Sequence, residues 1–142
     1  DALLGGEMSG HIFFNDRWPG FDDGIYAGAR MLEIIANSEQ NDPFATVPNT
    51  LSTPEINIPA ADEEKFQIVK TFIENSNFSD ANIVSIDGIR VEFEKGWGLL
   101  RPSNTSPCLV LRFEAETNDD LNEIKENFYL GLKSIKPNIN KF

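Results

Sequence analysis

The chain has 142 residues, of which 40% are hydrophobic, and a formal net charge of -11 from 23 acidic and 12 basic residues. That length suits one ordinary domain, or one small domain with part of another. The negative charge disfavours nucleic acid and anionic membranes as partners, and no apolar run is long enough to span a bilayer. A small phosphorylated ligand remains compatible, because one local arginine acts at contact range while salt screens distant carboxylates.

Cysteine usage and the start of the chain bear on where the protein works. Cys108 is the single cysteine, so no internal disulfide can form and a reducing compartment fits best. No targeting pattern is visible, and we expect a cytoplasmic protein. The chain opens on Asp1 rather than on an initiator Met, and we therefore expect a fragment of a longer protein.

A polar segment with three prolines, residues 38–54, divides the chain into two parts. We predict a linker there, between a first part at residues 1–37 and a second part at residues 55–142. Both parts contain more acidic than basic residues. Neither part therefore has the basic composition of a nucleic-acid-binding domain.

The first part contains signals for one strand and one helix. Ile12-Phe13-Phe14 predicts a short buried strand, and Asp22 or Asp23 is placed to cap the helix that follows. One apolar face of this helix is predicted to contain Ile25, Ala29, Leu32 and Ile35. One strand and one helix bury too little surface for an independent core, so we interpret the first part as the truncated end of an α/β domain.

The second part contains signals for several strands and two helices. In chain order they are a strand at 55–58, a helix at 62–75, strands at 83–86, 89–93, 97–101 and 108–115, and a last helix after Thr117. Asp87-Gly88 is a hairpin signal, and Thr117 with Asp120 is typical of a capping box. We predict an α+β fold, a complete β-α-β-β-β-α domain with a four-stranded, mainly antiparallel sheet and both helices on one face.

The period of 3.6 residues predicts which side of each helix faces inward. For the helix at 62–75 the inward residues are Phe66, Val69, Phe72 and Ile73. For the last helix they are Leu121, Ile124, Phe128 and Leu132.

The segment Arg101-Pro102-Ser103-Asn104-Thr105-Ser106-Pro107, here called the arginine loop, is the first candidate site. It combines one fixed cation with four neutral hydrogen-bonding side chains between two prolines. A phosphate needs donors that converge from several directions, and guanidinium, hydroxyl, amide and backbone N–H groups can supply them. An ordinary surface turn uses the same residue types, so composition alone leaves both interpretations open.

The segment Gly5-Gly6-Glu7-Met8-Ser9-Gly10-His11, here called the glycine loop, is the second candidate site. Three glycines allow a sharp turn that gathers a carboxylate, a hydroxyl and an imidazole. A carboxylate accepts hydrogen bonds from two neighbouring hydroxyls, so Glu7 with Ser9 could hold a sugar. A solvated Glu7 and a structural His11 are the alternative.

The two loops together resemble a known family, the alpha-D-phosphohexomutases, in particular the bacterial phosphomannomutase/phosphoglucomutase branch. Gly6 to His11 resembles the sugar-binding loop of that family's third domain, and Phe21-Asp22-Asp23-Gly24 resembles the start of the helix that follows it. Lys95-Gly96-Trp97-Gly98-Leu99-Leu100-Arg101, leading into Ser103-Asn104-Thr105, resembles the approach to the phosphate-binding loop of the fourth domain. The resemblance covers almost the whole chain.

Details of both loops favour the hexose branch of this family. Phosphoglucosamine mutases typically carry Gln where Met8 stands and a Gly-Thr-Glu-Pro run where this chain has residues 104–107. Pro102 departs from the hexose branch, whose members often have a small or polar residue there. Because proline has no N–H, we expect it to remove one backbone donor from the loop.

The resemblance implies a fold and an activity. Residues 1–37 would be the end of the sugar-binding third domain, and residues 55–142 the phosphate-binding fourth domain, which has a TATA-binding-protein-like fold. The full-length enzyme would move phosphoryl between the 1- and 6-positions of glucose or mannose phosphate through a hexose 1,6-bisphosphate. Its partners would be hexose phosphates and the upstream domains of the same enzyme.

The resemblance also implies residue roles. Glu7 and Ser9 would hold sugar hydroxyls, with His11 near the ligand. The phosphate that is not transferred would be held by Arg101, Ser103, Asn104 and Thr105.

The catalytic groups of this family lie in other domains. This chain has no Asp-x-Asp-x-Asp or Asp-Gly-Asp run for magnesium and no Ser-His-Asn nucleophile motif. We therefore predict no catalytic residue, bound cofactor or metal site in this fragment, which alone would be inactive, while the full-length enzyme would use Mg²⁺. A free-standing phosphosugar-binding module and a structural or protein-interaction domain remain as alternatives.

Overall fold

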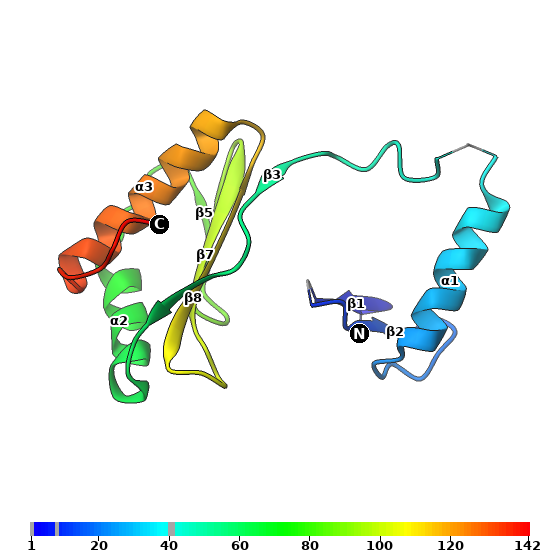
Figure 1. Cartoon of the computed structure of the whole chain (residues 1–142), viewed down its shortest axis with the longest axis horizontal. Helices are drawn as coiled ribbons and strands as arrows, with labels where there is room; N and C mark the ends of the chain where they lie inside the picture. Colours follow the sequence, from blue (N-terminus) through cyan, green and yellow to red (C-terminus); the bar gives the residue numbers. More distant parts are fainter. Residues whose placement is uncertain (1, 8, 40–41) are drawn as a thin grey trace. The chain divides into compact units, whose positions relative to one another are not determined.

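The computed structural model describes residues 2–7, 9–39 and 42–142, and the chain forms two compact units, Asp1–Pro48 and Asn49–Phe142. Each unit has its own strands and helices (Figure 1). Met8, part of the predicted sugar-binding motif, lies outside the described residues. None of the helices in these ranges combines the length and apolar character needed to cross a membrane.

Among its described residues, the first unit contains a two-stranded sheet and one helix. Strand β1 (Leu4–Gly6) pairs antiparallel with β2 (Ile12–Phe14), and helix α1 (Gly24–Asn37) follows. Strand β2 confirms the predicted strand. Strand β1 was not predicted because two of its three residues are glycine, which is depleted in strands.

Helix α1 is capped by Asp23, whose Oδ1 accepts the N–H groups of Ile25 and Tyr26 at 3.0 Å each. The helix packs through a face that the sequence did not predict. Tyr26 stacks on Trp18 with ring centroids 4.3 Å apart, and the guanidinium of Arg30 lies 4.5 Å from the centre of the Phe14 ring.

The predicted aliphatic face of α1 is exposed instead. Ile25 is 89% exposed and Leu32 is 66% exposed, and Ala29 and Ile35 are exposed as well. The predicted helix is confirmed, and among the described residues its aliphatic face is exposed while stacking and cation–π contacts are made from another side.

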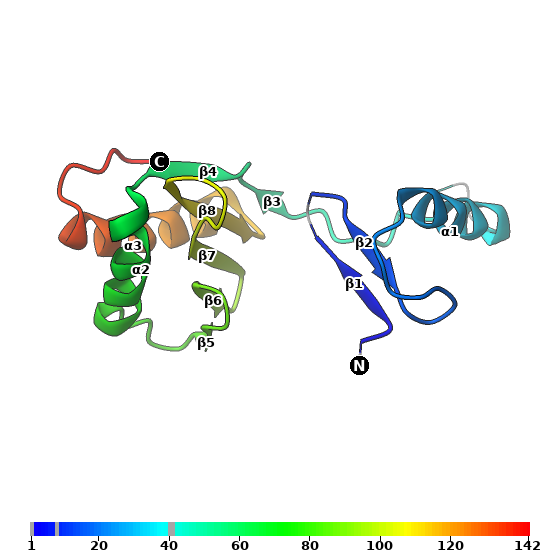
Figure 2. The same ribbon diagram turned by 90° about the horizontal axis from the view of Figure 1, so that it is seen from below.

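The second unit is an antiparallel sheet with two helices on one face (Figure 1, Figure 2). Its strands are β3 (Leu51–Ser52), β4 (Ile56–Pro59), β5 (Asn82–Val84), β6 (Ile89–Phe93), β7 (Gly96–Pro102) and β8 (Cys108–Ala115). Its helices are α2 (Asp62–Asn75) and α3 (Asn118–Ile135). The strand order is β3-β8-β7-β6-β5, and β4 also pairs with β8.

The predicted fold class is confirmed, although the sheet is larger than predicted. Within residues 49–142, all of which are described, the sheet has six strands rather than four. The six strands include two short edge strands, β3 and β5, of 2 and 3 residues. Strand β5 corresponds to the strand predicted at 83–86, so β3 is the one that the sequence did not indicate. Strand β3 lies inside the segment predicted as a linker, and its Leu51 and Ser52 pair with Ala115 and Glu114 of β8.

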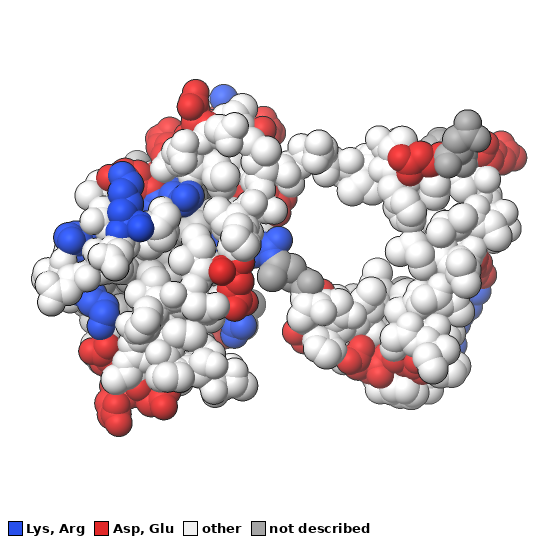
Figure 3. Space-filling model, in the orientation of Figure 1, with Lys and Arg blue, Asp and Glu red and all other residues white. Residues whose placement is uncertain are grey.

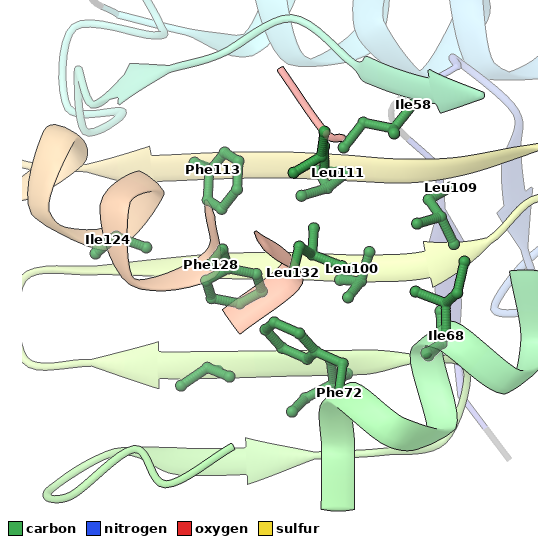
Figure 4. Packing of buried hydrophobic residues seen from close by; sticks show 14 of the residues in the cluster. Ile58, Ile68, Phe72, Leu100, Leu109, Leu111, Phe113, Ile124, Phe128 and Leu132 are labelled. Carbon is green, nitrogen blue, oxygen red and sulfur yellow. The ribbon is translucent and has the colours of Figure 1, made fainter. Parts of the chain in front are cut away.

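The core of the second unit lies between the sheet and the two helices (Figure 4). Phe128 of α3 is 0% exposed, and its ring centroid lies 5.4 Å from that of Phe72 in α2 and 5.2 Å from that of Phe113 in β8. Leu100 and Leu109, which flank the arginine loop in the sequence, are also 0% exposed. Both ends of that loop therefore continue directly into the core.

The helix faces in this unit follow the sequence prediction except at one position. Val69 and Phe72 of α2 are buried, as are the predicted α3 residues Ile124, Phe128 and Leu132. Phe66, however, is 55% exposed, while Lys65 is buried. The prediction for Phe66 was wrong because hydrophobic periodicity alone cannot select a buried lysine over a neighbouring phenylalanine.

We expect Gly98→Ala to destabilise the second unit by about 1–3 kcal/mol. A Cβ atom at this position would lie 2.5 Å from Cε2 of Phe128 and 3.1 Å from Cδ1 of Phe113. Urea unfolding, followed through amide signals of β7 and β8, measures the effect. Gly28→Ala in α1 is the control because its added Cβ meets open space. An unchanged unfolding midpoint for Gly98→Ala would contradict this packing.

Candidate functional site

The glycine loop joins β1 to β2 and is closed by its own backbone. The N–H of Glu7 donates to the carbonyl of His11 at 2.9 Å, and the N–H of Gly10 donates to the carbonyl of Glu7 at 3.0 Å. Gly10 has a φ of 91°, in the left-handed region that favours glycine. The Ser9 hydroxyl donates to Oε2 of Glu7 at 3.2 Å. The turn thus brings a carboxylate and a hydroxyl together at an exposed position.

His11 is held by a residue that the sequence suggested only as a possible helix cap. Its Nδ1 lies 2.6 Å from Oδ2 of Asp22, and the N–H of Ile12 donates to Oδ1 of the same carboxylate at 3.3 Å. Engagement of Nδ1 makes Nε2 the ring nitrogen available to a ligand. The adjacent acids therefore have different roles: Asp22 positions His11, and Asp23 caps α1.

The contact with Asp22 changes the protonation of both groups. The hydrogen bond to Asp22 raises the pKa of His11 above its ordinary value of 6.5, and the charges of Asp22 and Glu7 add to the effect. The same hydrogen bond lowers the pKa of Asp22. The charged pair therefore forms between the lowered pKa of Asp22 and the raised pKa of His11, and it is lost as the pH falls through the first or rises through the second.

The arginine loop joins β7 to β8 and is organised by Ser103. Ser103 is only 6% exposed, and its N–H donates to the carbonyl of Cys108 at 3.0 Å. Its Oγ accepts the N–H groups of Thr105 at 3.3 Å and Ser106 at 3.1 Å. The hydroxyl proton of Ser103 remains a donor for a ligand. Asn104 and Thr105 are exposed at the tip of the loop.

Arg101 lies beside a carboxylate from the neighbouring hairpin. Its side chain is 34% exposed, and its guanidinium lies 3.5 Å from Oδ2 of Asp87. The next residue, Gly88, has a φ of 76°, and a Cβ there would lie 2.3 Å from the carbonyl oxygen of Leu100. The Asp87-Gly88 turn is therefore seated directly against β7. The sequence predicted this turn but not its contact with the candidate site.

Pro102 is the last residue of β7 and is buried opposite Leu109. The N–H of Ser103 points toward β8, and the N–H groups of successive strand residues alternate in direction. The donor that Pro102 lacks would therefore lie on the side of β7 away from β8, beyond the last pairing with β6 at Leu100. The effect of Pro102 on phosphate binding stays a prediction.

Arg101 is the one basic residue in the sequence of the arginine loop. On the face of the second unit drawn in Figure 3, Lys and Arg form small groups among Asp and Glu side chains. A hollow of about 620 Å³ lies elsewhere in the second unit, among residues such as Asn75, Phe78 and Asn127, and none of the predicted site residues lines it. Any anion recognition by the loop would depend on Arg101 and on neutral donors at contact range.

No dense cluster of metal-ligating side chains is found in the part of the chain that the structure describes. Residues 2–7, 9–39 and 42–142 contain no group of three or more His, Cys, Asp or Glu side chains that could hold a metal ion.

Both parts of the chain match domains of one known protein family. Residues 55–130 match the family described as "Phosphoglucomutase/phosphomannomutase, C-terminal domain". Residues 1–51 match "Phosphoglucomutase/phosphomannomutase, alpha/beta/alpha domain III". The chain belongs to the phosphoglucomutase/phosphomannomutase family. The glycine loop falls within the match to domain III, and the arginine loop falls within the match to the C-terminal domain.

Several curated relatives of this family match nearly the whole chain. A phosphomannomutase/phosphoglucomutase of Pseudomonas syringae is 54% identical over 140 residues, which are 97% of this chain and 30% of the relative. A phosphoglucomutase of Neisseria meningitidis is 47% identical over 141 residues, with the same two shares. A phosphoglucosamine mutase of Methanocaldococcus jannaschii is 33% identical over 138 residues, which are 95% of this chain and 30% of the relative. The two relatives with the higher identities are named as phosphomannomutase/phosphoglucomutase and phosphoglucomutase. This agrees with the hexose branch that the residues of the two loops favoured.

A solved structure supports the same assignment. A phosphoglucomutase/phosphomannomutase family protein from Burkholderia thailandensis matches with a TM-score of 0.86 and 46% identity, over 99% of this chain and 30% of that protein. The chain thus spans 30% of the length of its matched relatives. The family and the fold class that the sequence predicted are confirmed.

We expect Asp22→Asn to lower the pKa of His11 toward 6.5, because the variant loses the charged hydrogen-bond acceptor that raises it. His11 is the single histidine of the chain, so its imidazole proton signals can be followed by NMR against pH without overlap from another histidine. Glu7→Gln is the matched control. Its effect should be smaller, because Glu7 is the least of the influences on His11. An unchanged titration midpoint in Asp22→Asn would contradict the pairing.

Proposed function

We propose that this chain is the substrate-recognition part of a phosphohexomutase that interconverts hexose 1-phosphate and hexose 6-phosphate, with glucose or mannose as the sugar. The observation that carries this proposal is the presence of two polar loops, one in each of two consecutive family domains. One loop offers an acceptor for sugar hydroxyls, and the other offers a cation and neutral donors for phosphate.

The glycine loop would bind the sugar. The carboxylate of Glu7 can accept hydrogen bonds from two neighbouring hydroxyls, and Ser9 can donate or accept beside it. In the unliganded loop the Ser9 hydroxyl donates to Glu7 at 3.2 Å. A sugar hydroxyl can replace that weak contact, while His11 presents Nε2 nearby because Asp22 engages Nδ1.

The arginine loop would bind the phosphate that does not react. Arg101 supplies a fixed charge that can donate two parallel hydrogen bonds to phosphate oxygens. Asn104 and Thr105 supply exposed neutral donors, and Ser103 supplies its hydroxyl proton. The loop is braced by internal hydrogen bonds before any ligand arrives, which reduces the ordering cost of binding.

Binding of the distant phosphate would assist catalysis by the complete enzyme. A group that does not react can contribute binding energy that orients the reacting group, so it raises the rate as well as the affinity. The chain itself would neither form a phosphoenzyme nor hold Mg²⁺. Those functions belong to the upstream domains in this proposal, and the isolated chain would bind substrate without converting it.

A titration of the isolated chain with glucose 1-phosphate tests the proposed phosphate contacts. We expect backbone amide shifts confined mainly to the arginine loop, with a dissociation constant on the order of millimolar or weaker, because the two loops belong to separate units. Arg101→Ala should abolish these shifts. Lys141→Ala, which removes one charge from a side chain that is 67% exposed, is the matched control and should bind as the unaltered chain does.

The outcomes separate the competing functions. Shifts confined mainly to the arginine loop support its phosphate role. No shift in either loop at glucose 1-phosphate concentrations on the order of tens of millimolar would exclude the phosphate role and favour a structural domain.

In the full-length enzyme that contains this chain, we expect Arg101→Ala to lower kcat/KM by roughly 10- to 100-fold, the effect of losing a charged hydrogen-bonding group. The reason is lost orientation of the substrate through its remote phosphate. Steady-state kinetics with glucose 1-phosphate measure the effect, with Lys141→Ala as the control. An unchanged kcat/KM in Arg101→Ala would show that this residue does not act on the substrate.

A further inference from the structure

A buried lysine lies behind the arginine loop. Lys65, in the first turn of α2, has a side chain that is 5% exposed. Its Nζ lies 2.5 Å from Oδ1 of Asp62 and donates to the carbonyl oxygen of Ser106 at 3.1 Å. Lysine is rarely buried to this extent unless it is paired. The helix therefore places its one buried charge under the loop that was proposed to bind phosphate.

The contact with Ser106 fixes the second half of the loop. The Ser106 carbonyl accepts one hydrogen bond from Lys65 and another from the N–H of Cys108 at 2.8 Å. Next to it, the carbonyl of Pro107 accepts the N–H of Ala60 at 3.0 Å, just before α2 begins. Because proline also fixes its own φ, little freedom remains between Ser106 and β8.

The first half of the loop is fixed separately by Ser103. Its buried Oγ accepts the N–H groups of Thr105 and Ser106. The segment 103–106, which includes three of the four predicted phosphate ligands, is thus held at both ends. Ser103 holds one end from within the loop, and Lys65 holds the other from the neighbouring helix.

Stability alone is a weak explanation for Lys65. Removing an ammonium from water costs several kcal/mol, and replacing a buried ion pair by apolar residues of similar size is often neutral or stabilising. Here the partner Asp62 is 69% exposed, so water weakens the attraction between the two charges. The hydrogen bond from Lys65 to the Ser106 carbonyl explains the buried ammonium better, because it fixes the position of the loop.

We propose that Lys65 is a positioning residue for phosphate binding, which holds the Ser106 carbonyl and thereby sets the geometry of the donors in residues 103–106. This inference rests on the proposed function of the arginine loop. Lys65 does not itself touch the ligand. It lowers the ordering cost of binding by keeping the loop in its binding conformation.

A titration of the 142-residue chain with inorganic phosphate, followed through the amide signals of residues 103–106, tests this role. Lys65→Met keeps the apolar stem and removes the donor. It is expected to weaken phosphate binding by roughly 5- to 20-fold, the cost of losing one charged hydrogen bond from a preorganised loop. Lys70→Met is the matched control, because Lys70 lies on the same helix with a side chain that is 67% exposed, and it should bind as the unaltered chain does.

A conservative variant separates positioning from simple stability. Lys65→Arg keeps a donor and the charge, and it should bind phosphate more tightly than Lys65→Met even if both variants unfold at the same urea concentration. Equal phosphate affinity in Lys65→Met, Lys70→Met and the unaltered chain would overturn the positioning role. Absence of binding by the unaltered chain would instead overturn the proposed function of the arginine loop.

If Lys65→Met does not fold, the positioning role can be tested on the unaltered chain. A buried, hydrogen-bonded ammonium can be followed through its side-chain ¹⁵N signal. Phosphate should shift the Lys65 Nζ signal with the same dissociation constant as the amides of residues 103–106. Loop shifts without any change at Lys65 would overturn the positioning role.

Discussion

The antiparallel pairing of β7 with β8 is the constraint on which the core of the second unit and the arginine loop both depend. The pairing extends from Gly96 and Ala115 to Pro102 and Leu109, and it places Gly98 beneath the ring of Phe128. Leu100 and Leu109 belong to the core, so the positions of the loop ends are set by hydrophobic packing rather than by loop chemistry. A shift of one residue in this register would exchange the buried and exposed faces of each strand and move Arg101 to the wrong side.

The sequence predicted most of the second unit because its signals agree with one another. Helix α2 and strands β6 and β8 have the predicted bounds, and Thr117 caps α3 by accepting the N–H of Asp120. Such agreement arises where hydrophobic periodicity, turn residues and caps specify the same structure. In the first unit the strand, the helix and its Asp23 cap were also predicted. The contacts of α1 were not, because Tyr26 and Arg30 rather than the aliphatic stripe make the local contacts.

The residues that support the candidate site were less predictable than the site residues themselves. Asp22, Asp87 and Lys65 each contact a predicted residue or loop, at distances of 2.6, 3.5 and 3.1 Å. Lys65 and Ser106 are 41 positions apart in the sequence. Local patterns cannot reveal such contacts, which depend on strand register and on the docking of α2. A charged residue at an inward helix position is the one signal that could have indicated Lys65, since a lysine there requires a buried partner.

The two loops differ in how firmly the protein supports them, and this difference suits the proposed activity. The arginine loop continues into a buried core and is held by Ser103, Lys65 and the backbone of Ala60. The glycine loop closes a short two-stranded sheet, and α1 beside it buries none of its residues. In the proposed function, the phosphate bound by the arginine loop is the one that does not react. A rigid loop suits that role, because donors that are already in place cost little to order when the phosphate binds.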